Sequence, residues 1–270
     1  MNVIANAGDF VTWKHSLFNM IAAKNFAGQL INDEWGSSYN PELSRDTEAS
    51  ASFIAKSIHF LGTDTTTKVP DMYGYWTLSD IYEEMNTGPA LAYREGNYGL
   101  LMKGDPNIPA SFDLAKPAFN AFRLLHMMTD QTVPVTGGIA AATDNGVGAV
   151  ATLAADGSSI QILVYNHVNS FDTATADAMA QEQTLVSVDV NNLPFTPTSV
   201  RHYVVDHTHS NSHTAWVEMG KPPTPSADQW ATLADASELC YYETTGNGSN
   251  SWSIMFPQNT YSASLIELRR

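Results

Sequence analysis

The chain is poor in cysteine and in positive charge. Cys240 is its single cysteine, which excludes an internal disulfide and argues against a zinc–cysteine site. Thirteen basic residues stand against 28 acidic ones, and the net charge of −15 would repel a phosphate backbone. We therefore expect no nucleic-acid partner. The charge would not hinder binding of a neutral sugar. An acidic surface that keeps the protein in solution would also account for it.

Long apolar runs and nucleotide motifs are also missing. No stretch approaches the roughly 20 apolar residues of a membrane-spanning helix, so we expect no membrane partner. Met1 is not followed by the basic region and apolar core of a signal peptide, and a cytoplasmic and a secreted location both stay open. The chain has no phosphate loop, dinucleotide fingerprint or Gly-x-Ser-x-Gly elbow, and we expect no cofactor.

The first half of the sequence alternates between helical and strand patterns. Apolar spacing predicts helices over residues 10–21 and 46–62, the second capped by Asp46, and a third beginning at Pro117. Residues 28–33 and 72–78 are the expected strands. Helices that alternate with strands are typical of βα units around a parallel sheet.

The second half reads as short strands punctuated by Gly, Asn, Asp and Pro. The expected strands are residues 147–153, 160–166, 184–190, 200–206, 251–256 and 262–268, with one helix at 226–238 and an exposed loop at 166–183. A complete eightfold barrel takes about 250 residues. We therefore predict an α/β plus all-β fold, in which a partial (β/α)8 TIM-type barrel (catalytic, residues 1–131) precedes an antiparallel β-sandwich (accessory, residues 132–270).

The most informative segment is QLINDEWGSSY at residues 29–39, where an apolar run ends in Asp33, Glu34 and Trp35. Barrel strands deliver catalytic groups at their carboxyl ends. Glycoside hydrolysis needs a carboxylate near the anomeric carbon, and an aromatic ring offers a face to the sugar. Glu34 is thus a candidate catalytic residue, the alternative being a surface acid at a strand end. Alternation would turn Asp33 to the opposite side of the strand.

This segment resembles glycoside hydrolase family 39, best known for β-xylosidases. The family carries a similar Glu-Trp segment at the end of its seventh barrel strand, and its nucleophile matches Glu34. The similarity continues through FIAKSI (53–58), YWTLSDIYEE (75–84, near the eighth strand), KPAFNAFRLL (116–125) and HSNSHTAWVEMG (209–220).

The resemblance implies a retaining β-glycosidase that hydrolyses terminal β-linked sugars, with xylosides or xylo-oligosaccharides as substrates. It implies that Trp76, Glu83 and Glu84 bind the sugar. Trp35 and Tyr39 are further expected substrate-binding residues that support the cleft.

Two features depart from the family pattern. The Asn-Glu-Pro motif that carries the general acid/base is absent, as are the first six barrel strands. Glu84, Glu95 (where relatives have His) or a carboxylate of a partner chain are candidates for this role. The alternative is a catalytically incomplete sugar-binding or structural remnant. A sheet with open edges also predicts a homo-oligomer that covers the open barrel.

Three histidines, His207, His209 and His213, follow Asp206 closely. Histidine is a common metal ligand, so a metal site is conceivable there. A hydrogen-bonded structural turn is the preferred interpretation, and we expect no metal.

Overall fold

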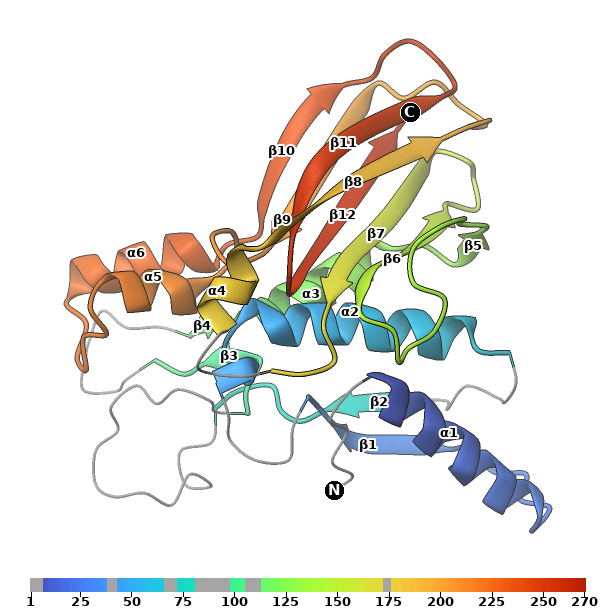
Figure 1. Cartoon of the computed structure of the whole chain (residues 1–270), viewed down its shortest axis with the longest axis horizontal. Coiled ribbons are helices and arrows are strands. Elements are labelled where there is room, and N and C mark those ends of the chain that lie inside the picture. Colours follow the sequence, from blue (N-terminus) through green and yellow to red (C-terminus); the bar gives the residue numbers. More distant parts are fainter. Residues whose placement is uncertain (1–6, 38–42, 66–71, 81–97, 105–112, 172–175) are drawn as a thin grey trace.

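The computed structural model describes the chain except residues 1–6, 38–42, 66–71, 81–97, 105–112 and 172–175 (Figure 1). Its elements lie in layers. A parallel pair, β1 (Ile31–Trp35) and β2 (Met72–Tyr75), forms the lowest layer in Figure 1. Helix α1 (Ala7–Ala22) lies beside it, and α2 (Glu48–Thr63) and α3 (Pro117–Met127) lie above it.

A six-stranded sheet stands on the other side of α2 and α3. Its order is β10-β9-β12-β7-β6-β5, and each neighbouring pair is antiparallel. Its strands are β5 (Gln131–Val133), β6 (Gly146–Leu153), β7 (Ser159–His167), β9 (Ser199–Val205), β10 (Cys240–Thr245) and β12 (Ser262–Arg269).

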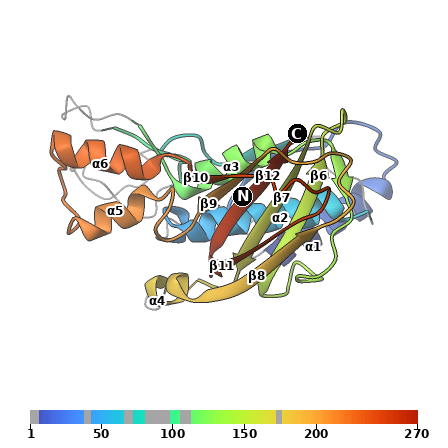
Figure 2. The same ribbon diagram turned by 90° about the horizontal axis from the view of Figure 1, so that it is seen from above.

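A second, two-stranded sheet covers part of the outer face of the six-stranded one. It consists of β8 (Gln183–Val190) and β11 (Trp252–Asn259), paired antiparallel. Valines of β8 and Phe256 of β11 pack on Ile162 and Ile266 of the larger sheet. Short elements complete the described part: η1 (Leu43–Arg45), β3 (Leu101–Met102), β4 (Leu114–Ala115) and α4 (Ala176–Gln181). Helices α5 (Ser212–Glu218) and α6 (Ala227–Ser237) project beyond one end of the sheets (Figure 2).

The helix starts follow from local sequence. Pro117 occupies the first turn of α3, where its missing N–H costs no hydrogen bond. Ser226 and Gln229 form a reciprocal capping box at the start of α6. The prediction that Asp46 caps α2 is wrong. Thr47 is the N-cap residue, and Asp46 is instead drawn into an ion pair with Lys116.

One apolar core runs through both predicted domains. Trp35, Phe53 and Leu124 of the helical half are contiguous with Leu163 and Leu265 of the six-stranded sheet. The layer of α2 and α3 therefore has two apolar sides, one toward β1 and β2 and one toward the sheet. Residue 131, the expected domain boundary, begins β5 and does not interrupt this packing.

The six strands expected in the second half are confirmed within about three residues at each end. Other expectations were wrong: β1 lies two to three residues later than 28–33, and β2 ends at Tyr75. The expected loop at 166–183 contains α4, while α5 and β10 were missed. None of the helices in the described ranges is long and apolar enough to cross a membrane.

Candidate functional site

The candidate site lies at the carboxyl ends of β1 and β2. Glu34 and Trp35 end β1, and Tyr75 followed by Trp76 ends β2. The backbone N–H of Trp76 donates to the carbonyl of Trp35 over 3.0 Å, so the two strand ends are held together. The peptide bond between Trp76 and Thr77 is cis. Glu34 and Trp76, predicted from separate motifs, are thus brought to the same edge.

A bulge interrupts the pairing of β1 just before its end. Asn32 pairs with Tyr73 and Trp35 pairs with Tyr75, so two residues of β1, Asp33 and Glu34, lie opposite one residue of β2, Gly74. Bulges re-aim side chains and are common at barrel rims and beside active sites. Asp33 is exposed, whereas Glu34 is half-buried. Successive side chains of a regular strand point to opposite faces of the sheet. Because of the bulge, this rule cannot be applied to Asp33 and Glu34.

Gly74 permits this close strand approach. A Cβ at Gly74 would lie 2.7 Å from the backbone oxygen of Asp33, closer than real Cβ atoms come. The residue therefore has to be glycine if the segment ahead of Glu34 is to keep its place.

Trp35 is part of the core beneath the site. Its side chain is 2% exposed, with its ring 5.2 Å from Phe10 in a stacked arrangement and 5.2 Å from Tyr75 edge-on. Phe53 and Phe122 complete the surrounding cluster. Trp35 therefore packs beneath the strand end that carries Glu34, a position suited to the expected role of supporting the cleft.

A buried ion cluster lies next to these strand ends. Lys116 Nζ is 2.7 Å from Asp46 Oδ1 and 2.7 Å from Asp80 Oδ1, and the three side chains are at most 3% exposed. The backbone N–H of Gly99 donates to Asp80 over 2.9 Å. These contacts connect the segment before α2, the segment after β2 and the start of α3.

The electrostatics of the cluster reflect its burial. Burial raises the pKa of Asp80 to about 6, although Lys116 opposes this shift. Burial alone would lower the pKa of Lys116, but the charges and hydrogen bonds of Asp46 and Asp80 outweigh it, and the pKa is raised. Burial also raises the pKa of the Tyr75 hydroxyl. The positive charges of Arg45 and Lys116 oppose this shift, and the negative charge of Asp46 adds to it.

Arg45 lies beside the segment that follows Glu34. It is buried, its guanidinium carbon lies 4.4 Å from the ring centroid of Tyr98, and a Cβ on Gly36 would be 3.3 Å from its Nη1. A fixed cation over an aromatic face is a stabilising arrangement. Sequence reasoning missed Arg45, Asp80 and Lys116. Asp80 and Lys116 lie in segments that resemble the family, and this resemblance is the sequence feature that could have identified them.

Four predicted site residues, Tyr39, Glu83, Glu84 and Glu95, lie outside the described residues. Trp76 is described, is half-buried and stands beside the end of β1. Among the predicted residues, the described site therefore comprises Glu34, Trp35 and Trp76.

The histidines after β9 form a hydrogen-bonded turn. Asp206 Oδ1 accepts from the backbone N–H groups of Thr208 and His209 and lies 2.9 Å from His209 Nδ1. His207 Nδ1 lies 3.3 Å from Glu48 Oε1 at the start of α2. Within the described ranges, no three His, Cys, Asp or Glu side chains are grouped so that they could hold a metal ion.

Parallel strands with packed helices and an attached sheet domain define a TIM-barrel-like class of fold, which two solved structures share. The GH39 enzyme of Xanthomonas axonopodis pv. citri matches with a TM-score of 0.73 at 18% identity, over 96% of this chain and 48% of that one. A monomeric β-xylosidase of Caulobacter crescentus CB15 matches with a TM-score of 0.68 at 22% identity, over 94% and 48%.

The chain belongs to glycosyl hydrolases family 39, whose family model matches residues 16–247. A β-xylosidase of Geobacillus stearothermophilus is 27% identical over 204 residues, which cover 75% of this chain and 34% of that protein. The chain thus spans about half the length of the two solved structures and about a third of this relative.

Proposed function

We propose that the chain acts as a retaining β-glycosidase on terminal β-linked xylosides, with Glu34 as the nucleophile. The observation that carries this proposal is the position of Glu34, a half-buried carboxylate at the carboxyl end of β1 beside Trp76. Trp76 would offer its ring to the sugar. The similarity to a β-xylosidase supports the choice of substrate.

In the proposed reaction the Glu34 carboxylate attacks the anomeric carbon as the bond to the leaving oxygen breaks. A carboxylic acid about 5–5.5 Å away protonates that oxygen, and the ester formed on Glu34 is then hydrolysed by water. Glu84 and Glu95 are the candidate acids within the chain. A carboxylate of a partner chain is the third candidate.

We propose that β1 and β2 are the last two strands of a barrel. Residues 1–131 would then be the partial (β/α)8 part and residues 132–270 a β-sandwich made of the six-stranded and two-stranded sheets. The parallel pairing of β1 and β2 supports the barrel assignment, and the apolar layer between the six-stranded and two-stranded sheets supports the sandwich assignment.

We further propose that the partial barrel associates with a second copy. Among the described strands, β1 and β2 pair only with each other. Ile31 and Met72 form a cross-strand pair and are 53% and 59% exposed. Covering this apolar pair would remove it from water. Sedimentation at micromolar concentration should show a dimer that Ile31→Thr with Met72→Thr weakens. A wild-type monomer at every concentration would reject the association.

An aryl xyloside tests the proposed nucleophile, because a good leaving group needs little protonation and bypasses the unidentified acid. With 4-nitrophenyl β-xyloside, Glu34→Gln should reduce kcat about 10³-fold or more. The matched control, Asp33→Asn, changes the neighbouring carboxylate and should keep most activity. Unchanged turnover by Glu34→Gln would reject the assignment, and xylose binding by a wild type without turnover would favour the sugar-binding remnant.

A further inference from the structure

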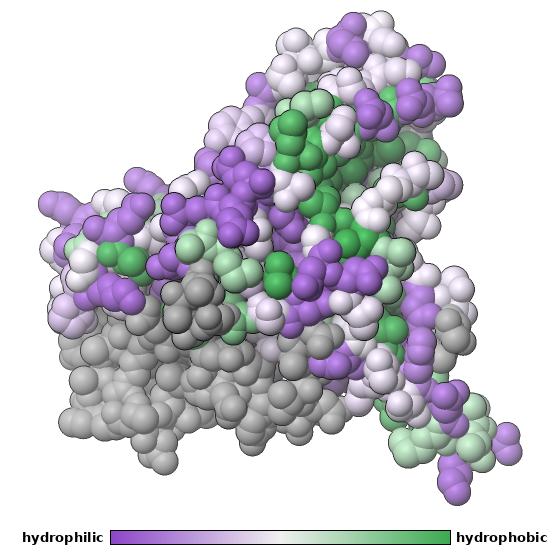
Figure 3. Space-filling view, viewed as in Figure 1, coloured by the Kyte–Doolittle hydropathy of each residue, from purple (hydrophilic) through white to green (hydrophobic). Residues whose placement is uncertain are grey.

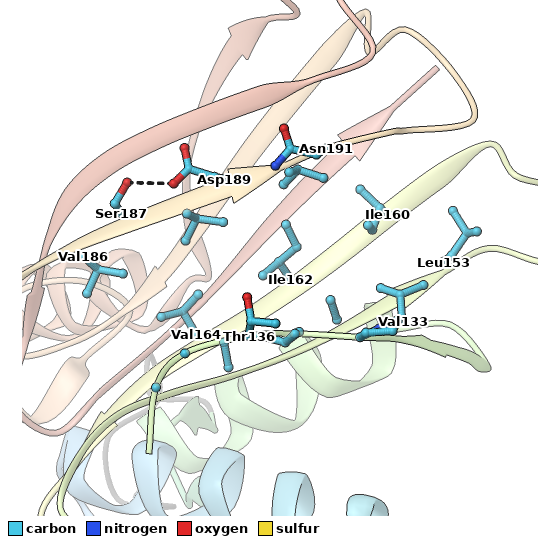
Figure 4. Close-up of a pocket in the computed structure, with 18 of the residues that line it drawn as sticks. Val133, Thr136, Leu153, Ile160, Ile162, Val164, Val186, Ser187, Asp189 and Asn191 are labelled. Atoms are coloured by element: carbon cyan, nitrogen blue, oxygen red, sulfur yellow. Dashed lines mark hydrogen bonds between the residues drawn. The ribbon is translucent and has the colours of Figure 1, made fainter. Parts of the chain in front are cut away.

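An open groove lies between the two sheets, away from the candidate site (Figure 4). Its volume is about 400 Å³, and a band of hydrophobic surface marks its opening in the space-filling view (Figure 3). Among the described residues that line the groove, Asp189 has the one titratable side chain. The groove therefore offers mainly apolar contacts, and side chains suited to proton transfer lie elsewhere on the sheets.

Such side chains gather where β9 ends and β10 begins. Among the described strands, β10 is the edge of the six-stranded sheet, and its residue Tyr242 is 55% exposed. The Tyr242 hydroxyl lies 2.8 Å from His209 Nε2, and His209 Nδ1 lies 2.9 Å from Oδ1 of the buried Asp206. The three side chains thus form one hydrogen-bonded relay that runs from the surface to a buried carboxylate.

The proton positions in this relay follow from Asp206. Burial alone would raise its pKa, but the hydrogen bonds and charge of His209 and the backbone N–H groups of Thr208 and His209 outweigh it. The pKa is therefore lowered, and the carboxyl group is ionised near neutral pH. A carboxylate only accepts hydrogen bonds, so His209 Nδ1 carries a proton. In the neutral imidazole Nε2 is then the acceptor, and the Tyr242 hydroxyl donates to it.

Two further titratable side chains of β9 and β10 interact with the relay, and both are neutral near pH 7. Burial lowers the pKa of His202, which pairs with Tyr242 across the sheet, to about 4, although Asp206 opposes the shift. Burial and the charge of Asp206 raise the pKa of the Cys240 thiol. Partial burial, with Cys240 and Asp206, also raises the pKa of the Tyr242 hydroxyl. Free phenolate is therefore scarce at Tyr242, and its reactivity depends on proton transfer to His209.

We propose that Tyr242 is a nucleophile for activated carboxylic esters, with His209 as its general base and Asp206 as the residue that orients His209. The phenolic oxygen forms a bond to the carbonyl carbon of the ester, and the bond from that carbon to the leaving oxygen breaks. The hydroxyl proton passes to His209 Nε2 and then to solvent, while the leaving group departs as an anion. The product is an ester on Tyr242, and no group is oxidised or reduced. This proposal is independent of the role of Glu34.

Tyr241 provides a matched comparison within the same chain. It precedes Tyr242 directly and is 46% exposed, but alternation turns it to the other face of β10. There its ring lies 5.3 Å from the ring of Tyr203 and 5.1 Å from the guanidinium carbon of Arg201. Because the two tyrosines are similarly exposed, a difference in their reactivity reports the contact with the histidine.

The probe is 4-nitrophenyl acetate, and tandem mass spectrometry would measure the acetyl group on each tyrosine. At about pH 8, Tyr242 should be acetylated tenfold faster than Tyr241 or more. The rate at Tyr242 should rise with the neutral fraction of His209 and level off above the pKa of that histidine. The rate at Tyr241 should continue to rise, because an unassisted tyrosine reacts as its phenolate and titrates near pH 10.

Two variants test the relay itself. His209→Gln removes the base and should reduce acetylation of Tyr242 to about the rate of Tyr241. Asp206→Asn keeps an oxygen that can accept from the backbone N–H groups but removes the charge that orients the imidazole. It should slow acetylation of Tyr242 at least about tenfold. Circular dichroism would establish that each variant is folded.

Two further variants are controls. His207→Gln changes the neighbouring histidine, which lies 3.3 Å from Glu48 Oε1, and should leave acetylation of Tyr242 unchanged. Cys240→Ala should also leave it unchanged, which would exclude transfer of the acetyl group from the thiol.

Equal rates at Tyr241 and Tyr242 in the wild type, or parallel rates at every pH, would overturn the proposal. Equal slowing by His209→Gln and His207→Gln would show that the effect is structural and would also reject it. Loss of the label in Cys240→Ala would make the thiol the nucleophile in place of Tyr242.

Discussion

Lys116 donates to Asp80 over 2.7 Å in the interior of the protein, and both side chains are 3% exposed. The same ammonium group is 2.7 Å from Asp46. One cation therefore serves two buried carboxylates from segments that flank the candidate site. Removing one member of a buried ion cluster is costly because it leaves the others uncompensated.

Lys116→Met should lower the free energy of unfolding by about 3–5 kcal/mol at pH 7, since Asp46 and Asp80 would lose their shared partner. Urea unfolding followed by tryptophan fluorescence would measure this. Lys24→Met, at an exposed lysine, is the control and should change stability by less than about 0.5 kcal/mol. A loss below about 1 kcal/mol for Lys116→Met would contradict the described cluster.

The Asp80 carboxyl should titrate near pH 6, because burial raises its pKa to about 6. An unfolded aspartate titrates near 3.9, so the folded state binds more protons between pH 4 and 6. The contribution of Asp80 to the free energy of unfolding therefore falls as pH rises through this window, by on the order of 3 kcal/mol. Asp80→Asn keeps an acceptor for Lys116 and cannot titrate. The stability difference between wild type and Asp80→Asn should shrink across the window, and a constant difference would reject the raised pKa.

His209 should titrate above its ordinary value. Its hydrogen bond to Asp206 raises its pKa, although partial burial opposes the shift. The contribution of the His209–Asp206 pair to the free energy of unfolding is fully present below pH 6.5. It is lost as pH rises through the pKa that His209 has in the folded protein. NMR titration would show this, with His59 as an internal control because burial lowers its pKa to about 4. A His209 midpoint below 6.5 would contradict the described pair.

Trp35 and Trp76 should respond differently to substitution. Trp35→Ala removes a buried ring and should destabilise the fold by about 3–5 kcal/mol. Trp76→Ala, at a half-buried ring beside the site, should cost less stability and weaken binding of xylose or raise KM. Denaturant unfolding and ligand titration on both variants separate the two roles. If Trp76→Ala left ligand affinity unchanged, its proposed role as a sugar platform would fail.

Gly74→Ala should destabilise the protein by about 1–3 kcal/mol, because the added Cβ meets the backbone of Asp33. It should also reduce turnover, since the displaced segment leads directly into Glu34. Gly62→Ala is the matched control. That position lies in α2 with no atom within 4 Å of an added Cβ, and alanine favours helix by up to about 1 kcal/mol. Equal thermal stability of the two variants would contradict the close approach at Gly74.

The sequence predicted regular elements well where apolar spacing was regular. The helix expected at 226–238 matches α6 together with its two cap residues. β10 was missed because all but its first residue are exposed and show no alternation, and α5 was missed because it has only seven residues.

The candidate site was only partly predictable. Glu34 and Trp76 stood out because each lies in a motif at the end of a strand. The bulge in β1 and the pairing of Asp46 with Lys116, seventy residues later in the chain, depend on tertiary contacts that no local pattern encodes. From the local sequence alone, Asp46 resembled a helix cap, because its partner Lys116 is distant in the chain.

The most direct test of the proposed chemistry is to trap the covalent intermediate. A 2-deoxy-2-fluoro-xyloside with a dinitrophenyl leaving group should transfer its sugar to the nucleophilic carboxylate as a glycosyl ester and release dinitrophenolate. This ester should hydrolyse slowly, and peptide mass spectrometry would then locate the sugar. We predict a xylosyl ester on Glu34 that is absent from Glu34→Gln and present in Asp33→Asn. A label on another carboxylate, or hydrolysis of xylosides with Glu34 unlabelled, would contradict the assignment of Glu34 as the nucleophile.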